Sequence, residues 1–489
     1  MKPLAPLRPI ARLPRSPFPL FCASRALHTT PFDRAAITST PPHPPATTEA
    51  TSPPPISAPS IPKPPPLSIL PLSTLIRSYL ITSLSASPLL LPPSLSVLGI
   101  LAHSNSRFLN PDSNFLLRWM LKKTFYAQFC AGETREEVGR TVDALKRRGF
   151  TGVILGYARE IVMQHDQADH APEAVPKKEG EVDADIEIWK KGTLDTVEMT
   201  QKGDFVALKF TGAGSRAIRL LSKALPPDAA LEKATVKICN LAKARGVRLL
   251  FDAEQQAVQG GLDAWTLDFQ KRYNSTTSGK AVVYGTYQAY LRSTPAALAR
   301  DLAAASAGQF TLGVKLVRGA YLGCDPRHLF WSTKEDTDRV YDGIAESLMR
   351  TKYGDVLIPL HGEGNEKFPD VNLVLASHNH TTVRKAMAVQ KEQLESGKKR
   401  IDMVYGQLMG MADEVSCELV QAGKDVQGLG GYGEGKVDVP KAYKYLVWGT
   451  VGECVKYLLR RAEENRDAVV RTKEGLAALR TELVRRLGL

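Results

Sequence analysis

The chain has 489 residues, which is enough for one large domain or two ordinary ones with a sizeable buried core. Its apolar content of 43% and charged content of 24% are ordinary for a globular protein. The formal net charge is +13, but residues 1–34 alone carry six basic side chains and one acid, and no basic run is interleaved with aromatic residues. The charge therefore does not indicate a nucleic-acid partner.

The six cysteines are far apart in the sequence and form no C-x-x-C pair. This spacing predicts neither a zinc ribbon nor a redox dithiol, so we expect reduced thiols and no metal site.

The N-terminal 66 residues are unlike the rest of the chain. Residues 1–40 contain several arginines and serines and a single acid, Asp33, which is typical of a mitochondrial transit peptide; a disordered basic tail is the alternative. Residues 41–66 hold 12 of the 33 prolines and predict an extended, disordered linker.

Residues 67–148 predict an N-terminal helical region, and its first part, 67–103, is strongly apolar. Arg77, Pro88, Pro92 and Pro93 interrupt this stretch before it reaches the ~20 residues that a spanning helix needs. We therefore expect two short helices that pack on the folded domain. The alternative is that they lie in a membrane interface.

Residues 149–489 alternate short apolar runs, rich in β-forming residues, with helical patterns such as Asp228–Arg245 and Thr294–Ala307, as parallel βα units do. The predicted strands are 152–157, 205–210, 248–252, 281–287, 312–317, 372–377, 402–408 and 442–448. Eight such units predict an α/β fold of the (β/α)8 barrel type. A doubly wound sheet is the second choice, but no strand is followed by G-x-G-x-x-G. Residues 164–201 look like an acidic solvated insertion with a short helix at Ile186–Lys190.

Polar residues follow nearly every predicted strand, at the end where barrel enzymes build their sites. Lys209 and Asp252 end neighbouring strands and could form a buried ion pair, which by itself would be only stabilising. Near the C-terminus, a predicted helix over Glu453–Arg471 carries the adjacent Arg460 and Arg461. Two guanidinium groups suit a carboxylate, although a solvated charged helix is an equally simple reading.

Several motifs together resemble the proline dehydrogenase family, in its mitochondrial fungal form, from about residue 120 to 475. These motifs are LKFTGAG around Lys209, LLFDAE around Asp252, TYQAYL around Gln288, KLVRGAYL around Lys315, ASHN around His378, YGQLMGM around Gln407 and YLLRRAEEN around Arg460. The chain departs from the family's pattern at Gly156, where Asp is frequent, and in the LVWGT run after Tyr445.

The resemblance implies roles for individual residues. Asp252, Lys315, Lys209 and Tyr445 would be catalytic, with Asp252 orienting Lys209. Proline would be bound by Arg460, Arg461, Lys209, Leu316, Tyr321 and Glu160, and FAD by Ala253, Gln288, Lys315, Val317, Gly319, Ala320, Ser377, His378, Asn379, Gln407 and Glu464.

The resemblance also implies oxidation of L-proline to Δ1-pyrroline-5-carboxylate, with hydride passing from C5 to flavin N5 and electrons continuing to ubiquinone. The expected location is the matrix side of the mitochondrial inner membrane, with possible peripheral membrane association. Two alternatives stay open: a 4-hydroxyproline dehydrogenase on the same fold, and a Schiff-base lyase that uses Lys209 as nucleophile.

Overall fold

The computed structural model describes residues 64–104, 106–159, 183–360, 367–428, 440–466 and 469–488, all in one compact unit. The predicted transit peptide and all but the last three residues of the predicted linker lie outside the described residues.

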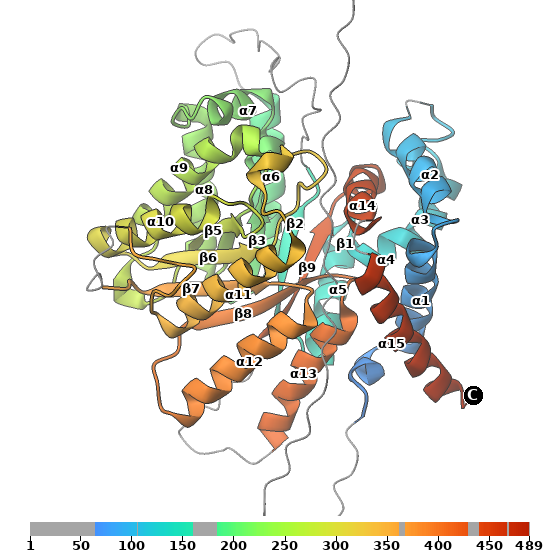
Figure 1. Ribbon diagram of the computed structural model, residues 1–489. Coiled ribbons are helices and arrows are strands. Elements are labelled where there is room, and N and C mark those ends of the chain that lie inside the picture. Colours follow the sequence, from blue (N-terminus) through green and yellow to red (C-terminus); the bar gives the residue numbers. More distant parts are fainter. Residues whose placement is uncertain are drawn as a thin grey trace, which may run out of the picture. The chain divides into compact units, whose positions relative to one another are not determined.

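Eight parallel strands close into a barrel, because β9 pairs with both β8 and β2 (Figure 1). The strands are β2 (Gly152–Tyr157), β3 (Phe205–Leu208), β4 (Arg248–Phe251), β5 (Val283–Gln288), β6 (Leu312–Val317), β7 (Val371–Ala376), β8 (Asp402–Leu408) and β9 (Ala442–Trp448). The predicted fold class is therefore confirmed. Four of the predicted strands are right to the residue, and the other four differ at their ends by one or two residues.

A short strand that the sequence did not predict, β1 (Cys130–Gly132), pairs with the end of β9. β8 follows β9 only as far as Tyr445, and β1 continues the same edge at Val447 and Trp448.

The strands are buried on both faces, as in parallel sheets covered by helices. Side chains such as Ile154, Phe205, Tyr284, Val374 and Tyr443 fill the barrel interior. The alternate side chains face outward and pack against the helices. The crossover helices are α6 (Ala184–Met199), α7 (Ser215–Ser222), α8 (Ala229–Arg245), α9 (Gln256–Tyr273), α10 (Thr294–Gly308), α11 (Lys334–Arg350), α12 (His380–Glu395) and α13 (Asp413–Gly428), with 3-10 turns η4 (Phe210–Ala213), η5 (Thr276–Ser278) and η6 (Arg327–Leu329).

Local sequence explains where these helices begin and end. The Asp228 side chain accepts hydrogen bonds from the amides of Ala230 and Leu231 at the start of α8, and α8 ends at Gly246 in the left-handed conformation, with φ of 65°. A side-chain cap and a terminal glycine satisfy groups that a helix leaves unbonded.

The predicted acidic insertion 164–201 is wrong in its second half. Residues 160–182 lie outside the described residues, but α6 is a full crossover helix between β2 and β3, and it buries Ile186, Trp189, Thr193 and Val197. These positions recur every three or four residues and form one apolar face, which the many charges between them obscured in the sequence.

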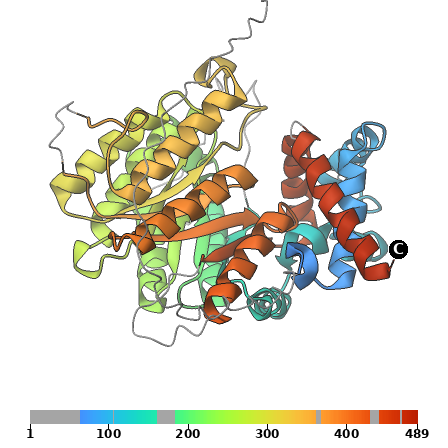
Figure 2. The ribbon, with the colours of Figure 1, turned by 60° about the horizontal axis from the view of Figure 1, so that its bottom comes forward.

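A helical layer from both ends of the chain lies beside the barrel. Figure 2 shows the red C-terminal helices against the blue N-terminal ones. The layer contains η1 (Pro66–Ile69), α1 (Leu72–Ala86), α2 (Leu91–His103), α3 (Phe115–Leu121), the π-helical turn η2 (Lys122–Tyr126), α4 (Ala127–Phe129), α14 (Val451–Arg466) and α15 (Val469–Leu487). The remaining N-terminal helix, α5 (Arg135–Arg148), lies on the barrel itself. The predicted pair of N-terminal helices is thus confirmed. The predicted helix 453–471 is wrong at its end, because α14 stops at Arg466 and a second helix follows.

No helix in the described part of the chain is by itself long and apolar enough to cross a membrane. Only α1 and α2 taken together, with a bend of 104° between them, satisfy such a test of length and composition.

Helix α14 follows the last strand but contacts α2, η2 and α1, while α5 packs on β1 and β2. The last helix of the barrel sequence is therefore displaced from the usual place beside its strand. This displacement allows α14 to reach residues that follow the carboxyl ends of the strands.

Candidate active site

The centre of the candidate site is a buried ion pair between β6 and the residue that follows β4. Lys315 Nζ lies 2.5 Å from Asp252 Oδ1, and the exposed fraction of each side chain is 8%. Lys315 lies in the carboxyl-terminal half of β6 and Asp252 directly follows β4, so both lie toward the same mouth of the barrel. A buried charge pair of this kind is retained only where each charge is well bonded.

Tyr445 completes this centre from β9. Its hydroxyl donates to Asp252 Oδ2 at 2.9 Å, and Lys315 Nζ lies 5.1 Å from the centre of its ring. A Cβ atom on Gly156 would lie 3.3 Å from the Tyr445 hydroxyl oxygen. The glycine in β2 therefore leaves room for the tyrosine to cross the barrel interior.

The predicted pairing of Asp252 with Lys209 is wrong. Among the described residues, the hydrogen-bond partners of the Asp252 carboxylate are Lys315 and Tyr445. Lys209 directly follows β3, and its backbone carbonyl accepts a hydrogen bond of 2.8 Å from the indole of Trp189 in α6. The crossover helix that the sequence did not predict in full therefore holds the Lys209 backbone in place.

Helix α14 brings one arginine of the pair to the loop after β6. Arg460 Nη1 lies 3.5 Å from the Tyr321 hydroxyl, and its guanidinium carbon is 5.3 Å from the centre of that ring. Arg461 lies over Tyr457 of its own helix, at 5.5 Å. Arg460 and Tyr321, both predicted to bind proline, therefore lie side by side.

Leu316 does not line the site, which corrects its predicted role. Side chains alternate along a strand, and Lys315 faces the interior, so its neighbour faces outward. Leu316 is fully buried in the apolar core between the barrel and the outer helices, together with Val314 and Ile344.

A second group of predicted residues gathers around Gln288 at the end of β5. Gln288 Oε1 accepts a hydrogen bond of 3.2 Å from the amide of Ala320. Its Nε2 atom is buried and has no hydrogen-bond partner in the part of the chain that the structure describes. An orphan donor of this kind is costly unless a ligand accepts from it, so the arrangement fits a bound polar group. Val317 accepts a backbone bond from Ala289, and a Cβ atom on Gly319 would come within 2.4 Å of the Tyr290 ring.

The predicted run Ser377–Asn379 follows β7 and is held by its neighbours. His378 Nε2 accepts from the amide of Leu408 at 3.0 Å, which places the proton of a neutral ring on Nδ1. Gln407 Nε2 donates to the Ser377 carbonyl at 3.1 Å, and the Asn379 side chain caps α12. The segment after β7 is thereby fixed to the end of β8.

Arg318 is the residue of this group whose importance the sequence did not reveal. Its guanidinium donates to Asp338, Ser377 and Thr382 at 2.7, 2.7 and 2.8 Å and lies over the Tyr341 ring at 4.3 Å. Burial alone would raise the pKa of Asp338, but the bonds from Lys334 and Arg318 outweigh it and leave this pKa below its ordinary value. Its position in KLVRGAYL, directly after a strand, was the available signal.

Of the remaining predicted residues, Ala253 is buried beside Asp252. Glu160 lies outside the described residues, as does the side chain of Glu464. In the described part, one mouth of the barrel thus combines a buried lysine–carboxylate–tyrosine network, an arginine from α14 and an unsatisfied amide donor.

Comparison with known proteins gives a consistent result. A family model described as proline dehydrogenase matches residues 138–474. A probable mitochondrial proline dehydrogenase of Schizosaccharomyces pombe is 28% identical over 419 residues, covering 76% of this chain and 82% of the relative. A hydroxyproline dehydrogenase of Bos taurus is 30% identical over 407 residues, covering 75% and 82% respectively.

Among solved structures, proline utilization A (PutA) from Bdellovibrio bacteriovorus, inactivated by N-propargylglycine, superposes with a TM-score of 0.54 at 16% identity. The likeness covers 81% of this chain and 38% of that one, and at this identity it shows the fold alone.

Proposed function

This chain belongs to the proline dehydrogenase family, and from that premise we propose that it oxidises L-proline to Δ1-pyrroline-5-carboxylate with FAD as cofactor. The coarser statement, an oxidoreductase of the proline and hydroxyproline dehydrogenase family, follows from the family match itself. The choice of proline, of FAD and of the residue roles below is the proposal.

The FAD would be held by residues that follow β4 and lie at or after the ends of β5, β6, β7 and β8, with Glu464 of α14. Gln288 supports this because its buried Nε2 atom needs an acceptor, which a flavin carbonyl or ring nitrogen offers. The proposed contacts are Ala253, Gln288, Lys315, Val317, Gly319, Ala320, Ser377, His378, Asn379, Gln407 and Glu464. When bound, the flavin supplies hydride acceptance at N5; the chain supplies position and charge.

Arg460, Arg461 and Lys209 are proposed to hold the substrate carboxylate, with Glu160 near them as a balancing acid. Arginine suits this task because its planar fork matches a carboxylate. Tyr321 supports the arrangement, since its ring lies against Arg460 and restricts the guanidinium. Holding one end of a small substrate in a fixed orientation can lower the activation barrier by up to about 7–11 kcal/mol.

Asp252, Lys315 and Tyr445 form the floor of the proposed site. Because Lys315 and Tyr445 occupy both oxygens of Asp252, the carboxylate is neutralised without using the arginines. The cationic end of Lys315 would favour negative charge that develops nearby during the reaction.

The buried Lys315–Asp252 pair at the same mouth as Arg460 is the observation that carries the proposal. The test is the absorbance spectrum of the purified chain, before and after proline is added without oxygen. We expect flavin bands that bleach with proline. A folded protein that takes up no flavin would refute the proposal. So would a bound flavin that stays oxidised after proline is added.

Hydroxyproline is the second candidate substrate, because a relative of similar identity carries that name. Parallel bleaching rates with L-proline and 4-hydroxyproline decide between the two substrates. A Schiff-base lyase that uses Lys209 is a third candidate of another class, and reduction with borohydride in the presence of substrate would trap its adduct.

Ubiquinone is the proposed electron acceptor. A small crevice supports this, because His378, a proposed flavin neighbour, forms one wall, while Ile81 and Thr82 of α1 and Leu479 of α15 form others. Ile81→Trp would fill the crevice. We expect it to slow reduction of a short-chain ubiquinone while leaving bleaching by proline unchanged; equal loss of both activities would contradict this route.

Peripheral binding to the matrix side of the mitochondrial inner membrane is also proposed. Most large apolar side chains that lie exposed in the described part of the chain belong to the segment from α1 to α3: Leu72, Ile76, Leu80, Leu89, Leu90, Val97, Ile100, Phe108, Leu109, Phe115, Leu116, Trp119 and Met120. We infer that these side chains form one apolar surface, and a large contiguous apolar patch marks an interaction site. Sedimentation with vesicles tests this: Phe115→Glu with Leu116→Glu should abolish it, whereas Ile358→Glu, an exposed residue elsewhere, should not.

The predicted transit peptide, residues 1–40, supports the mitochondrial location together with the Schizosaccharomyces pombe relative, which is named as a mitochondrial protein. Fusion of residues 1–66 to a fluorescent protein tests import. A fusion that stays in the cytosol would contradict the proposed location.

A further inference from the structure

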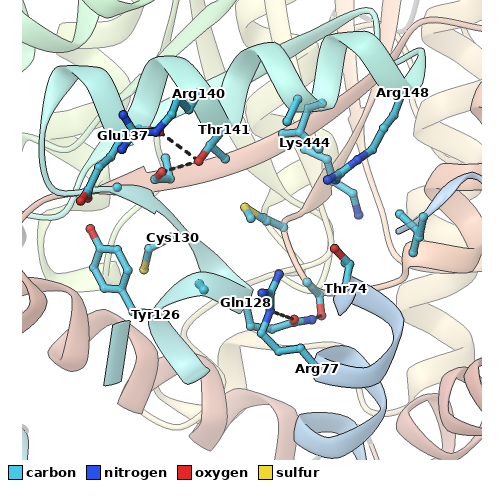
Figure 3. Close-up of a pocket in the computed structure, with 18 of the residues that line it drawn as sticks. Thr74, Arg77, Tyr126, Gln128, Cys130, Glu137, Arg140, Thr141, Arg148 and Lys444 are labelled. Carbon is cyan, nitrogen blue, oxygen red and sulfur yellow. Dashed lines mark hydrogen bonds between the residues drawn. The ribbon is translucent and has the colours of Figure 1, made fainter. Parts of the chain in front are cut away.

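A cavity of about 390 Å³ lies outside the barrel, among α1, α5, the segment from η2 to β1 and the outer face of β9 (Figure 3). Lys444 of β9 lies on its wall, between Tyr443 and Tyr445, which face the barrel interior. Because side chains alternate along a strand, this cavity is separated from the proposed active site by the sheet.

The wall of the cavity carries an excess of positive charge. Five cations line it (Arg77, Lys122, Arg140, Arg148 and Lys444), against two acids, Glu137 and Asp413. Both acids are already engaged. Lys444 Nζ lies 2.7 Å from Asp413 Oδ1, and Lys122 Nζ lies 2.7 Å from Glu137 Oε1.

Three arginines remain. Arg140 is exposed to solvent, whereas Arg77 from α1 and Arg148 from α5 are partly buried and form no ion pair with an acid among the described residues. Arg77 donates from Nε to Gln128 Oε1 at 3.2 Å, a neutral acceptor. No side chain or carbonyl of the described residues accepts a hydrogen bond from Arg148. Both side chains are partly buried, and Figure 3 shows them on facing walls of the cavity.

Their environment disfavours the charges that they carry. Burial, and then repulsion from Arg148, lowers the pKa of Arg77; burial also lowers the pKa of Arg148. The Asp413 carboxylate opposes both shifts but does not cancel them. An arginine nevertheless stays protonated in a protein, so the cost of burying the charge persists in the folded state. An anion placed between them would relieve that cost.

The rest of the wall is apolar, with Leu70, Leu145, Phe150 and Met409 among its residues. Cavities of about 300–1,000 Å³ accept small organic molecules, and a simple ion would leave most of this one unfilled. We propose that the cavity binds an amphiphilic anion whose carboxylate or phosphate lies between Arg77 and Arg148 and whose apolar body lies against these side chains.

The proposal is tested by isothermal titration of the purified full chain with octanoate, octyl phosphate, octanol and inorganic phosphate. Octanoate or octyl phosphate should bind. Octanol has the same eight-carbon alkyl group but no charge, so it should bind at least about tenfold more weakly. Inorganic phosphate should also bind more weakly, because it lacks the apolar body. Phosphate that binds as tightly as octyl phosphate would overturn the amphiphile assignment and leave a free-ion site.

Variants locate the binding. Arg77→Gln and Arg148→Gln should each weaken octanoate binding at least about tenfold, whereas Arg147→Gln, an exposed neighbour on α5, should leave it unchanged. Without ligand, Arg148→Gln should melt no lower than the wild-type chain, because it removes a buried charge. Unchanged octanoate affinity in Arg148→Gln, or no binding to the wild-type chain, would overturn the proposal.

Discussion

Lys315 lies in β6 and Asp252 directly follows β4, with β5 between the two strands, yet 2.5 Å separates the ammonium nitrogen from the nearer carboxylate oxygen. Thr286 lies in the intervening strand opposite Lys315, and its hydroxyl turns to the carbonyl of Phe251. The small side chain in the middle strand therefore lets the long lysine reach across it. This relationship joins the stability of the barrel to the chemistry at its mouth.

Lys315→Met should destabilise the fold by about 3–5 kcal/mol, because it leaves the Asp252 charge buried without its cation. Flavin reduction by proline should fall by a factor of about 10²–10³. Thermal unfolding and anaerobic bleaching measure the two effects. The double variant Lys315→Met with Asp252→Asn should recover most of the stability and none of the activity.

Lys444→Met is the matched control, because it breaks another buried ion pair, with Asp413, on the outer face of the barrel. It should lower the melting temperature while the folded fraction keeps its turnover. If Lys315→Met likewise affects stability alone, the proposed catalytic role of Lys315 is wrong.

Tyr445→Phe should slow the reaction, because Asp252 loses the hydrogen bond to Oδ2 while keeping Lys315. Loss of a bond to a buried carboxylate costs about 1–3 kcal/mol, so turnover should fall by roughly 5- to 150-fold if this network supports the transition state. Tyr443 lies on the same strand as Tyr445, and its hydroxyl donates to the Gly203 carbonyl. Tyr443→Phe removes that bond and should leave turnover intact. Equal effects of the two variants would indicate a structural role for both.

Arg461→Met should raise KM for proline by at least about 30-fold, corresponding to about 2 kcal/mol, if the α14 arginines hold the substrate carboxylate. The amount of bound flavin should not change. Steady-state kinetics with a soluble electron acceptor gives the value. Lys456→Met removes an exposed cation from the same helix and should leave KM unchanged; a normal KM in Arg461→Met would reject the assignment.

Asp263→Asn should stabilise the fold above neutral pH. Burial raises the pKa of Asp263 to about 6 from 3.8, so this group's contribution to stability is lost as pH rises through about 6. At about pH 8 the variant should melt a few degrees higher than the wild-type chain, a gain on the order of 1–2 kcal/mol. At about pH 4 the two proteins should melt at the same temperature. Asp268→Asn, on an exposed position of the same helix, should show no such gain; a gain independent of pH would contradict the mechanism.

The sequence by itself determined the order of the barrel strands and their limits to within two residues, because each strand is a short apolar run set between turn residues and helical patterns. It also placed most candidate site residues within or just after those strands, and parallel topology brings the carboxyl ends of the strands to one mouth. Both features depend on the local pattern of apolar residues and on the order of the strands, so they can be read from the sequence alone.

Only the tertiary structure decided which side chains meet. Asp252 pairs with Lys315 and not with Lys209, and the Leu316 side chain faces the outer core. Residues whose charges had suggested a solvated loop form α6, a helix with one buried face. The tertiary structure also carried α14 away from the barrel wall to bring Arg460 to Tyr321. Contacts of this kind depend on side-chain reach across strands and on which faces other segments cover, and sequence spacing encodes neither.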